Sequence, residues 1–143
     1  MLVSQILKHK GDLVFTASPH ETVAAAAALL HARRVGAMVI VDQQDRVVGI
    51  LSERDVVRVV AEEGAAGLSR PISTCMTRDV IFAEPGETVQ SLLERMTDRR
   101  IRHLPVLKDG RLSGLVSIGD LVKSKIAETE AEAETLKAYI SAG

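Results

Sequence analysis

The chain repeats its own sequence, and this duplication limits its fold more than any other feature. The segment SPHETV at 18–23 returns as EPGETV at 84–89, 66 residues later (84 minus 18). The phrase GILSERD at 49–55 returns as GLVSIGD at 114–120, 65 residues later (114 minus 49). One residue is therefore lost in between, and we locate the loss in the turns DQQDR and KDGR, because turns tolerate changes in length most easily. Such a repeat predicts two copies of one supersecondary unit.

Each copy predicts the element order β-α-β-β-α. A short strand comes first, and Glu-Thr then begins a helix whose apolar residues lie at i, i+3, i+4 and i+7. A hairpin of two strands follows, and a second helix begins at Asp55 in the first copy and at Asp120 in the second. The predicted strands are 13–17, 37–41, 47–51, 80–83, 103–107 and 112–116. These elements predict the α/β (α+β) fold class.

The duplication also predicts the domain organisation. We expect a first repeat at 1–63 that includes the N-terminal segment, a linker at 64–71, a second repeat at 72–126 and a helical tail at 127–143. A copy of about 60 residues buries little surface alone, so the two are expected to pack as a pseudo-symmetric pair. In the tail, Leu136, Tyr139 and Ile140 form an apolar stripe. This stripe either belongs to a solvated helix that covers its own domain or meets a second subunit.

The composition excludes several classes of function. A net charge of −1 and 2% aromatic residues argue against nucleic acid and anionic membranes as partners. The single cysteine, Cys75, forms no internal disulfide or thiolate metal site and suits a cytoplasmic protein. The sequence has no Ser-His-Asp or Cys-His grouping and no metal-ligand spacing. We therefore expect no enzymatic activity, no catalytic cofactor and no metal site.

The repeated Ser-x-x-Asp has two interpretations. Ser52 with Asp55, and Ser117 with Asp120, fit a capping box that starts a helix. Alternatively, the carboxylate at the helix start accepts hydrogen bonds from both hydroxyls of a ribose. The helix N-terminus then offers unpaired N–H groups to a phosphate. The duplication does not separate the two, because a repeated fold repeats its caps.

Differences between the copies favour a site in the second one. Gly119 precedes Asp120, although glycine costs about 1 kcal/mol in a helix, which suggests that something approaches this backbone closely. The strand before it reads Arg102-His103-Leu104-Pro105, with two donors suited to phosphate and a proline that leaves backbone groups free. Arg54 in the first copy either stays solvated or reaches a phosphate held by the second copy. Lys10 is a weaker candidate for the same contact.

The ordered set V-x-x-x-P-x-x-T-V, an apolar strand and G-h-h-S-x-x-D (h, apolar), present twice, resembles the CBS domain family. Two such repeats resemble a Bateman module, in particular the stand-alone bacterial CBS-pair proteins that carry SERD, RHLPV and SIGD. The likeness covers about residues 2–125 and leaves the tail outside.

The resemblance implies a regulatory, energy-sensing homodimer that binds an adenosine nucleotide in the cleft between the repeats. AMP comes first, with ADP, ATP or NAD as other ligands. The alternative is a protein-interaction adaptor without a physiological small ligand. The resemblance also implies that backbone groups near Val80 read the adenine edge, with Arg78 nearby. At another pocket position Thr16 matches Phe82, which either stacks on a base or fills the core. The predicted nucleotide-binding residues are Asp120, Ser117, Gly119, Arg102, His103, Leu104, Pro105, Val80, Arg78, Arg54, Lys10, Asp55, Ser52 and Thr16.

Overall fold

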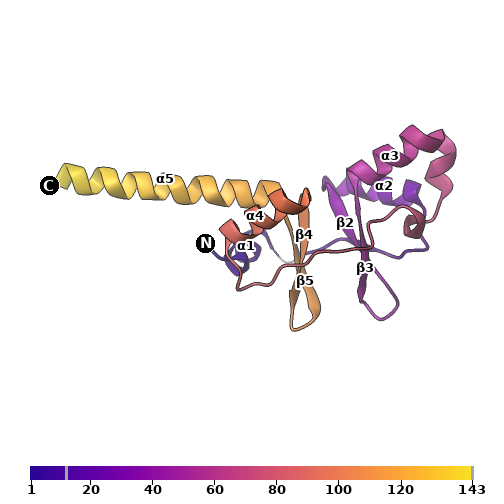
Figure 1. Cartoon of the computed structure of the whole chain (residues 1–143), viewed down its shortest axis with the longest axis horizontal. Helices are drawn as coiled ribbons and strands as arrows, with labels where there is room; N and C mark the ends of the chain where they lie inside the picture. The colour runs from indigo at the N-terminus through magenta and orange to yellow at the C-terminus, as the bar shows by residue number, and fades with distance from the viewer. Residues whose placement is uncertain (12, 143) are drawn as a thin grey trace. The chain divides into compact units, whose positions relative to one another are not determined.

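The computed structural model describes residues 1–11 and 13–142. Asp12 and Gly143, which fall in the predicted first repeat and tail, lie outside the described residues. The chain divides into two compact units, one of residues 13–81 and one of residues 1–12 with 82–143. Each combines helices with a small sheet, which confirms the mixed α/β fold class (Figure 1).

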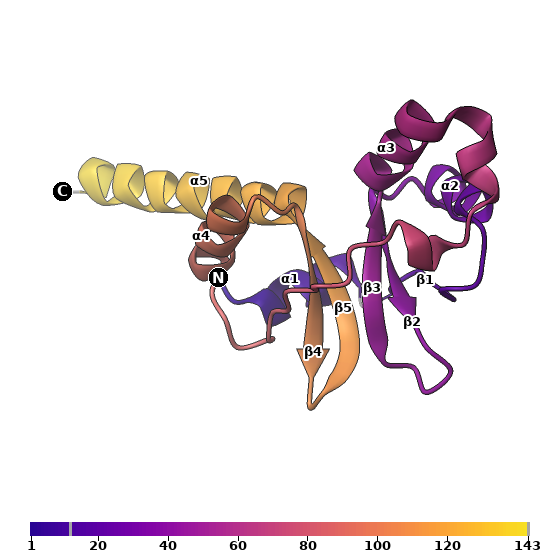
Figure 2. The same cartoon turned by 45° about the vertical axis from the view of Figure 1, so that its right-hand side comes forward.

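The unit of residues 13–81 contains a three-stranded sheet in the order β1-β2-β3. Strand β1 pairs parallel to β2, and β2 pairs antiparallel to β3. Helices α2 and α3 lie next to each other at one end of the strands (Figure 2). The bounds are β1 Thr16–Ala17, α2 Val23–Arg33, β2 Ala37–Val41, β3 Val47–Ser52 and α3 Glu53–Glu63, followed by the 3-10 helices η1 Gly64–Ser69 and η2 Ile72–Thr74. Thr22 caps α2 by accepting from the Ala25 N–H, which explains why the helix begins after Glu-Thr.

The other unit contains the antiparallel pair β4-β5, with a single parallel bridge from Ala83 to Val106. Its elements are α1 Val3–Lys10, α4 Val89–Arg99, β4 His103–Lys108, β5 Arg111–Ser117 and α5 Ile118–Ala142. The core combines one face of each element, and its most buried side chains are Val3, Val89, Leu92, Met96, Leu104, Val106, Val116 and Leu121. The predicted strands 13–17 and 80–83 are shorter than expected, since the first keeps two residues and the second only the bridge.

The strand registers confirm where the second copy lost a residue. The last pair of the first hairpin is Val41 with Val47, and the last pair of the second is Lys108 with Arg111. Both hairpins carry a register shift at the same point, at 40/41 and at 106/107. The length change therefore lies in the turn, where it leaves the paired strands intact.

The N-terminal segment lies in a different unit from the one expected. The N–H groups of Val3 and Ser4 donate to the carbonyls of Glu87 and Pro85, each at 2.9 Å, so α1 packs with the second copy. In the other unit, Ile72 and Ser73 make the same two bonds to Glu21 and Pro19, at 2.8 and 3.0 Å. Each unit is thus completed by the segment that precedes the other copy. The loop before α2 or α4 turns two carbonyls outward, and the docked segment supplies their donors.

The first glycine of each repeated phrase follows from this docking. A Cβ at Gly114 would lie 2.6 Å from Leu7 Cδ2, and one at Gly49 would lie 2.5 Å from Met76 Sδ. At either distance the neighbouring side chain would have to shift to admit a methyl group. Part of GxxSxxD is therefore explained by packing against the preceding segment.

Candidate functional site

The Ser-x-x-Asp phrases form capping boxes in both units. In the second copy, the Ser117 N–H donates to Asp120 Oδ2 at 2.8 Å, and the Asp120 N–H donates to Ser117 Oγ at 3.2 Å. The corresponding bonds between Ser52 and Asp55 measure 2.9 and 3.4 Å. The capping interpretation therefore holds for both copies, and the ribose interpretation depends on what else each carboxylate contacts.

The carboxylate of the first copy is occupied by its own unit. Asp55 is buried, with 5% of its surface exposed. Its Oδ1 accepts from Arg58 Nη1 at 2.9 Å, and Arg58 Nη2 donates to the Cys75 carbonyl at 3.0 Å. Since Oδ2 accepts from Ser52, both oxygens serve to fix the start of α3. Our sequence reasoning missed Arg58, although its spacing of three residues from Asp55 on one helix is a recognisable signal.

The carboxylate of the second copy is more open. Asp120 has 24% of its side chain exposed, and Lys10 Nζ donates to its Oδ2 at 2.6 Å and to the Leu115 carbonyl at 2.8 Å. The bonds that Asp120 accepts end on Oδ2, and Oδ1 accepts none from the described residues. Burial raises the pKa of Asp120, but the hydrogen bonds from Lys10 and Ser117 outweigh it and bring the pKa below its ordinary value. Near neutral pH Asp120 is therefore ionised, and its Oδ1 keeps the capacity to accept a hydrogen bond.

The start of β4 lies against the start of α5. The Arg102 carbonyl accepts from the Ile118 N–H at 2.8 Å, and His103 pairs with Ser117 across the two strands. Arg102 is exposed and His103 is half-buried. The structure therefore brings the strand start that carries Arg102 and His103 beside the Ser117 cap, and their contact with a ligand stays a prediction.

Gly119 is not required by the contacts of its own chain. A Cβ there would meet Ser117 Oγ at 3.6 Å, an ordinary contact, and the backbone does not have a positive φ. Because packing does not explain this glycine, a close approach by a ligand stays a prediction.

Pro105 changes how the second copy pairs. In the first copy the Val39 N–H donates to the Phe15 carbonyl at 3.2 Å. The equivalent of Val39 is Pro105, which has no N–H, so this bond has no counterpart. The Pro105 carbonyl still accepts from Ala83 at 2.9 Å, which leaves the single bridge in place of a strand. The neighbouring Leu104 pairs with Val116 of β5 and its side chain is fully buried in the core, so the structure does not present this side chain to a ligand.

The remaining predicted residues belong to the unit of residues 13–81. Thr16 and Arg54 are exposed, at β1 and at the start of α3. Arg78 Nη2 donates to the Ser73 carbonyl at 2.7 Å, and the Val80 N–H donates to the Arg78 carbonyl at 3.0 Å. Arg78 is therefore already engaged in holding the segment after η2, whereas Arg54 is exposed at a helix N-terminus.

A further pair was not anticipated from the sequence. Arg95 on α4 donates to both carboxylate oxygens of Glu87 and, at 3.0 Å, to the Phe82 carbonyl. The hydrogen bond from Arg95 brings the pKa of Glu87 below its ordinary value. This pair holds the loop that enters α4. Phe82 itself is half-buried.

The described residues include no cluster of three or more His, Cys, Asp or Glu side chains that could hold a metal ion. Among the described helices, none is both long and apolar enough to cross a membrane.

Comparison with known proteins agrees with the division of the sequence into two related copies. The family model for the CBS domain matches residues 11–62 and again 72–126, one match for each sequence copy. The chain belongs to the CBS domain family. The resemblance seen in the repeated motifs is thereby confirmed, and the chain is a CBS pair with a C-terminal helix.

Solved CBS proteins have the same fold. The CBS-domain containing protein ATU1752 from Agrobacterium tumefaciens is 43% identical, with a TM-score of 0.85 over 87% of this chain and 92% of that one. The CBS domain protein PAE2072 from Pyrobaculum aerophilum, solved in complex with AMP, is 28% identical, with a TM-score of 0.75 over 84% and 89%. The CBS domain pair of protein MJ0100, solved with 5-methylthioadenosine and S-adenosyl-L-methionine, is 27% identical, with a TM-score of 0.80 over 90% and 98%.

Proposed function

We propose that this CBS pair is a non-catalytic regulatory module that binds an adenosine nucleotide, and that the corner between β4 and α5 holds the ribose and phosphate. The observation that carries the proposal is the unequal state of the two capping carboxylates. Asp55 has both oxygens engaged by its own unit, whereas Asp120 keeps Oδ1 available. Support for the ligand class comes from PAE2072 and MJ0100, whose bound molecules all contain adenosine.

The residues around Asp120 suit the chemistry of a ribose phosphate. An ionised carboxylate accepts hydrogen bonds from two neighbouring hydroxyls, and charge-assisted bonds of this kind are the strong ones. Lys10 keeps the carboxylate ionised without occupying Oδ1. The exposed Arg102 and the N–H groups at the start of α5 supply positive charge for a phosphate. Gly119 allows the ligand to approach the helix start closely.

AMP is the ligand we propose first, because one phosphate suffices for the cations beside Asp120. ADP, ATP and NAD contain the same moiety and are the alternatives. In this proposal Pro105 belongs to the base side of the site, because a proline has no N–H for strand pairing and weakens the pairing around it. We further propose that the chain senses cellular energy as a homodimer.

Isothermal titration calorimetry tests the proposal on protein that mass spectrometry shows to be ligand-free. We expect AMP to bind and Asp120→Ala to weaken it about tenfold or more, the loss of roughly one charge-assisted hydrogen bond. Asp55→Ala is expected to have a smaller effect on affinity. Asp98→Ala, an exposed aspartate on α4, is the control for the change of charge.

Two results would contradict the proposal. If none of AMP, ADP, ATP, NAD and S-adenosylmethionine binds at millimolar concentration, the site is not a nucleotide site, and a protein-interaction adaptor becomes the better interpretation. If Asp55→Ala and Asp120→Ala weaken binding equally while both variants stay folded by circular dichroism, the second copy does not provide the main nucleotide-binding site.

A further inference from the structure

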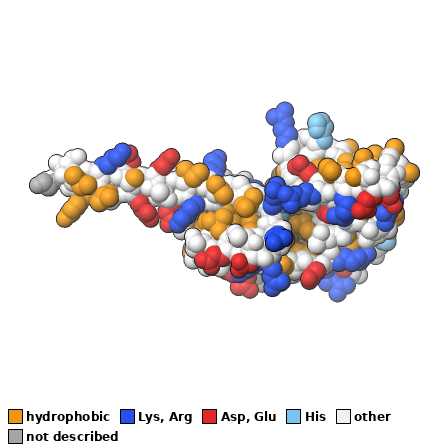
Figure 3. Space-filling view, turned by 45° about the horizontal axis from the view of Figure 1, so that its top comes forward, with side chains coloured by type: hydrophobic (Ala, Val, Ile, Leu, Met, Phe, Trp, Pro, Cys, Tyr) orange, Lys and Arg blue, Asp and Glu red, His pale blue; other side chains and the backbone are white. Residues whose placement is uncertain are grey.

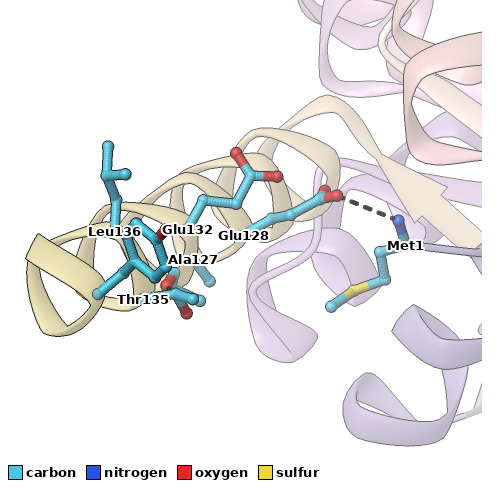
Figure 4. Close-up of a pocket in the computed structure, with 8 residues that line it drawn as sticks. Met1, Ala127, Glu128, Glu132, Thr135 and Leu136 are labelled. Carbon is cyan, nitrogen blue, oxygen red and sulfur yellow. Dashed lines mark hydrogen bonds and ion pairs between the residues drawn. The ribbon is translucent and has the colours of Figure 1, made fainter. Parts of the chain in front are cut away.

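Helix α5 continues well past the body of its own unit. Of its 25 residues, Leu121 and Ser124 are buried, and Glu128 is half-buried where its carboxylate lies 3.6 Å from the Met1 amine (Figure 4). Every residue from 129 to 142 is exposed. Figure 1 shows this part of the helix extending away from α1 and α4. The projecting segment of about 14 residues gains no packing energy from its own unit, so a partner surface would stabilise it.

The exposed segment carries a heptad pattern. Ile126, Ala133 and Ile140 fall at position a, and Val122, Thr129 and Leu136 fall at position d. The large members of this seam are 44 to 68% exposed. Figure 3 shows hydrophobic side chains on the projecting part of α5, between charged ones. Ile126 and Ile140 at a, with Leu136 at d, are the residue types that favour a two-stranded parallel coiled coil at these positions, whereas Ala133 and Thr129 are small.

The charges beside the seam identify the partner. Position g is occupied by Lys125, Glu132 and Tyr139, and position e by Lys123, Glu130 and Lys137. In a parallel pair of identical helices, g of one helix faces the next e of the other. Lys125 then faces Glu130 of a second copy, and Glu132 faces its Lys137, so both contacts are attractive.

An antiparallel pairing of the same seams has the opposite electrostatics. There g faces g and e faces e. With the apolar layers aligned, Glu130 and Glu132 each meet their own equivalent, and Lys123 meets Lys137. We propose that α5 forms a parallel two-stranded coiled coil with the α5 of a second copy along Val122–Ile140. This goes beyond the proposed homodimer by naming its surface and orientation.

Charge reversal in the full-length chain tests both parts of the proposal by sedimentation velocity. Glu132→Lys turns the attractive contact with Lys137 of the second copy into a repulsive one, and we expect the dimer dissociation constant to rise about fivefold or more. Adding Lys137→Glu exchanges the two signs and is expected to restore the affinity. Ala131→Lys combined with Ala138→Lys, both at the outward position f, gives the same change of net charge and should leave the affinity unchanged.

Several results would overturn the proposal. A monomer up to about 100 μM excludes it, since even a weak dimer of Kd near 10⁻⁵ M would then be populated. A dimer that responds equally to Glu132→Lys and to the Ala131→Lys/Ala138→Lys variant is held by another surface. If Lys137→Glu by itself lowers the dimer dissociation constant, the two helices are antiparallel, because the change removes the repulsion between Lys137 and Lys123 of the second copy.

Disulfide trapping gives a second, independent readout. Ala133→Cys at position a should form a covalent dimer under mild oxidation, and Ala131→Cys, at the outward position f, should form far less. The parent chain, whose one cysteine is the buried Cys75, sets the background. Equal trapping at both positions would contradict the assignment of Ala133 to the interface between the two helices.

Discussion

Replacing Gly114 by alanine tests the docking of α1 against β5, on which the position of Lys10 beside Asp120 depends. The added Cβ would lie 2.6 Å from Leu7 Cδ2 and 2.9 Å from Leu7 Cδ1. Carbon atoms pack best at about 3.5–4.0 Å, so the Leu7 side chain must move by roughly 1 Å. Overpacking of this size costs about 1–3 kcal/mol of unfolding free energy.

Gly86 provides a matched control for this substitution. A Cβ there would meet nothing within 4 Å, and the residue has no positive φ. Gly86→Ala should therefore be neutral or stabilise the protein by about 0.4–1 kcal/mol through the unfolded chain. The two alanines are thus expected to differ by at least about 1 kcal/mol.

Urea unfolding of the single and double variants separates the steric effect from other causes. In a Leu7→Ala background the clash is absent, so Gly114→Ala should cost close to nothing there. The coupling energy of the cycle should equal most of the single-variant cost. If Gly114→Ala destabilises both backgrounds equally, or has no effect in either, Leu7 does not pack against β5 as described.

Three further predictions follow from the two carboxylates and the strand before α5. Asp55→Ala should lower the free energy of unfolding by about 2 kcal/mol or more, because it removes a helix cap and leaves Arg58 without its carboxylate partner. A free energy of unfolding in urea that stays within about 0.5 kcal/mol of wild type would contradict this. Because the folded-state pKa of Asp120 lies below its unfolded value of about 3.9, its bond to Lys10 contributes fully above that value and is lost as the pH falls through the folded pKa. Lys10→Met should therefore reduce the loss of stability as the pH falls below about 3.9, and parallel pH profiles would refute the pairing. Pro105→Val supplies an N–H at the position where Val39 donates, and should weaken AMP binding without loss of thermal stability; unchanged affinity would exclude a role for this proline in the base site.

Much of the fold could be predicted because its signals are local. Helix α2 begins where Thr22 caps it, and the hairpin β4-β5 turns at Asp-Gly, so short-range hydrogen bonds carry both features. The strand residues near 15 and 81 were harder to predict. Their length depends on the partner strand, and in the second copy Pro105 removes the donor that would extend the pairing.

The candidate site could be predicted in its residues more than in its contacts. Ser117, Asp120 and Arg102 come together because the start of one strand and the end of its neighbour are adjacent in any antiparallel pair. The contact of Lys10 with Asp120 joins residues 110 positions apart, and the apolar spacing of α1 is the same whichever unit it packs on.

The sequence by itself determined that the chain is a duplicated β-α-β-β-α unit, since the caps, turns and apolar periods that form these elements each span a few residues. Only the tertiary structure decided which segment completes which unit and which carboxylate stays open. Two identical Ser-x-x-Asp phrases differ in state because Asp55 meets an arginine on its own helix, whereas Asp120 meets a lysine brought from α1. The bond between Lys10 and Asp120 depends on how a distant segment packs, and no local pattern encodes it.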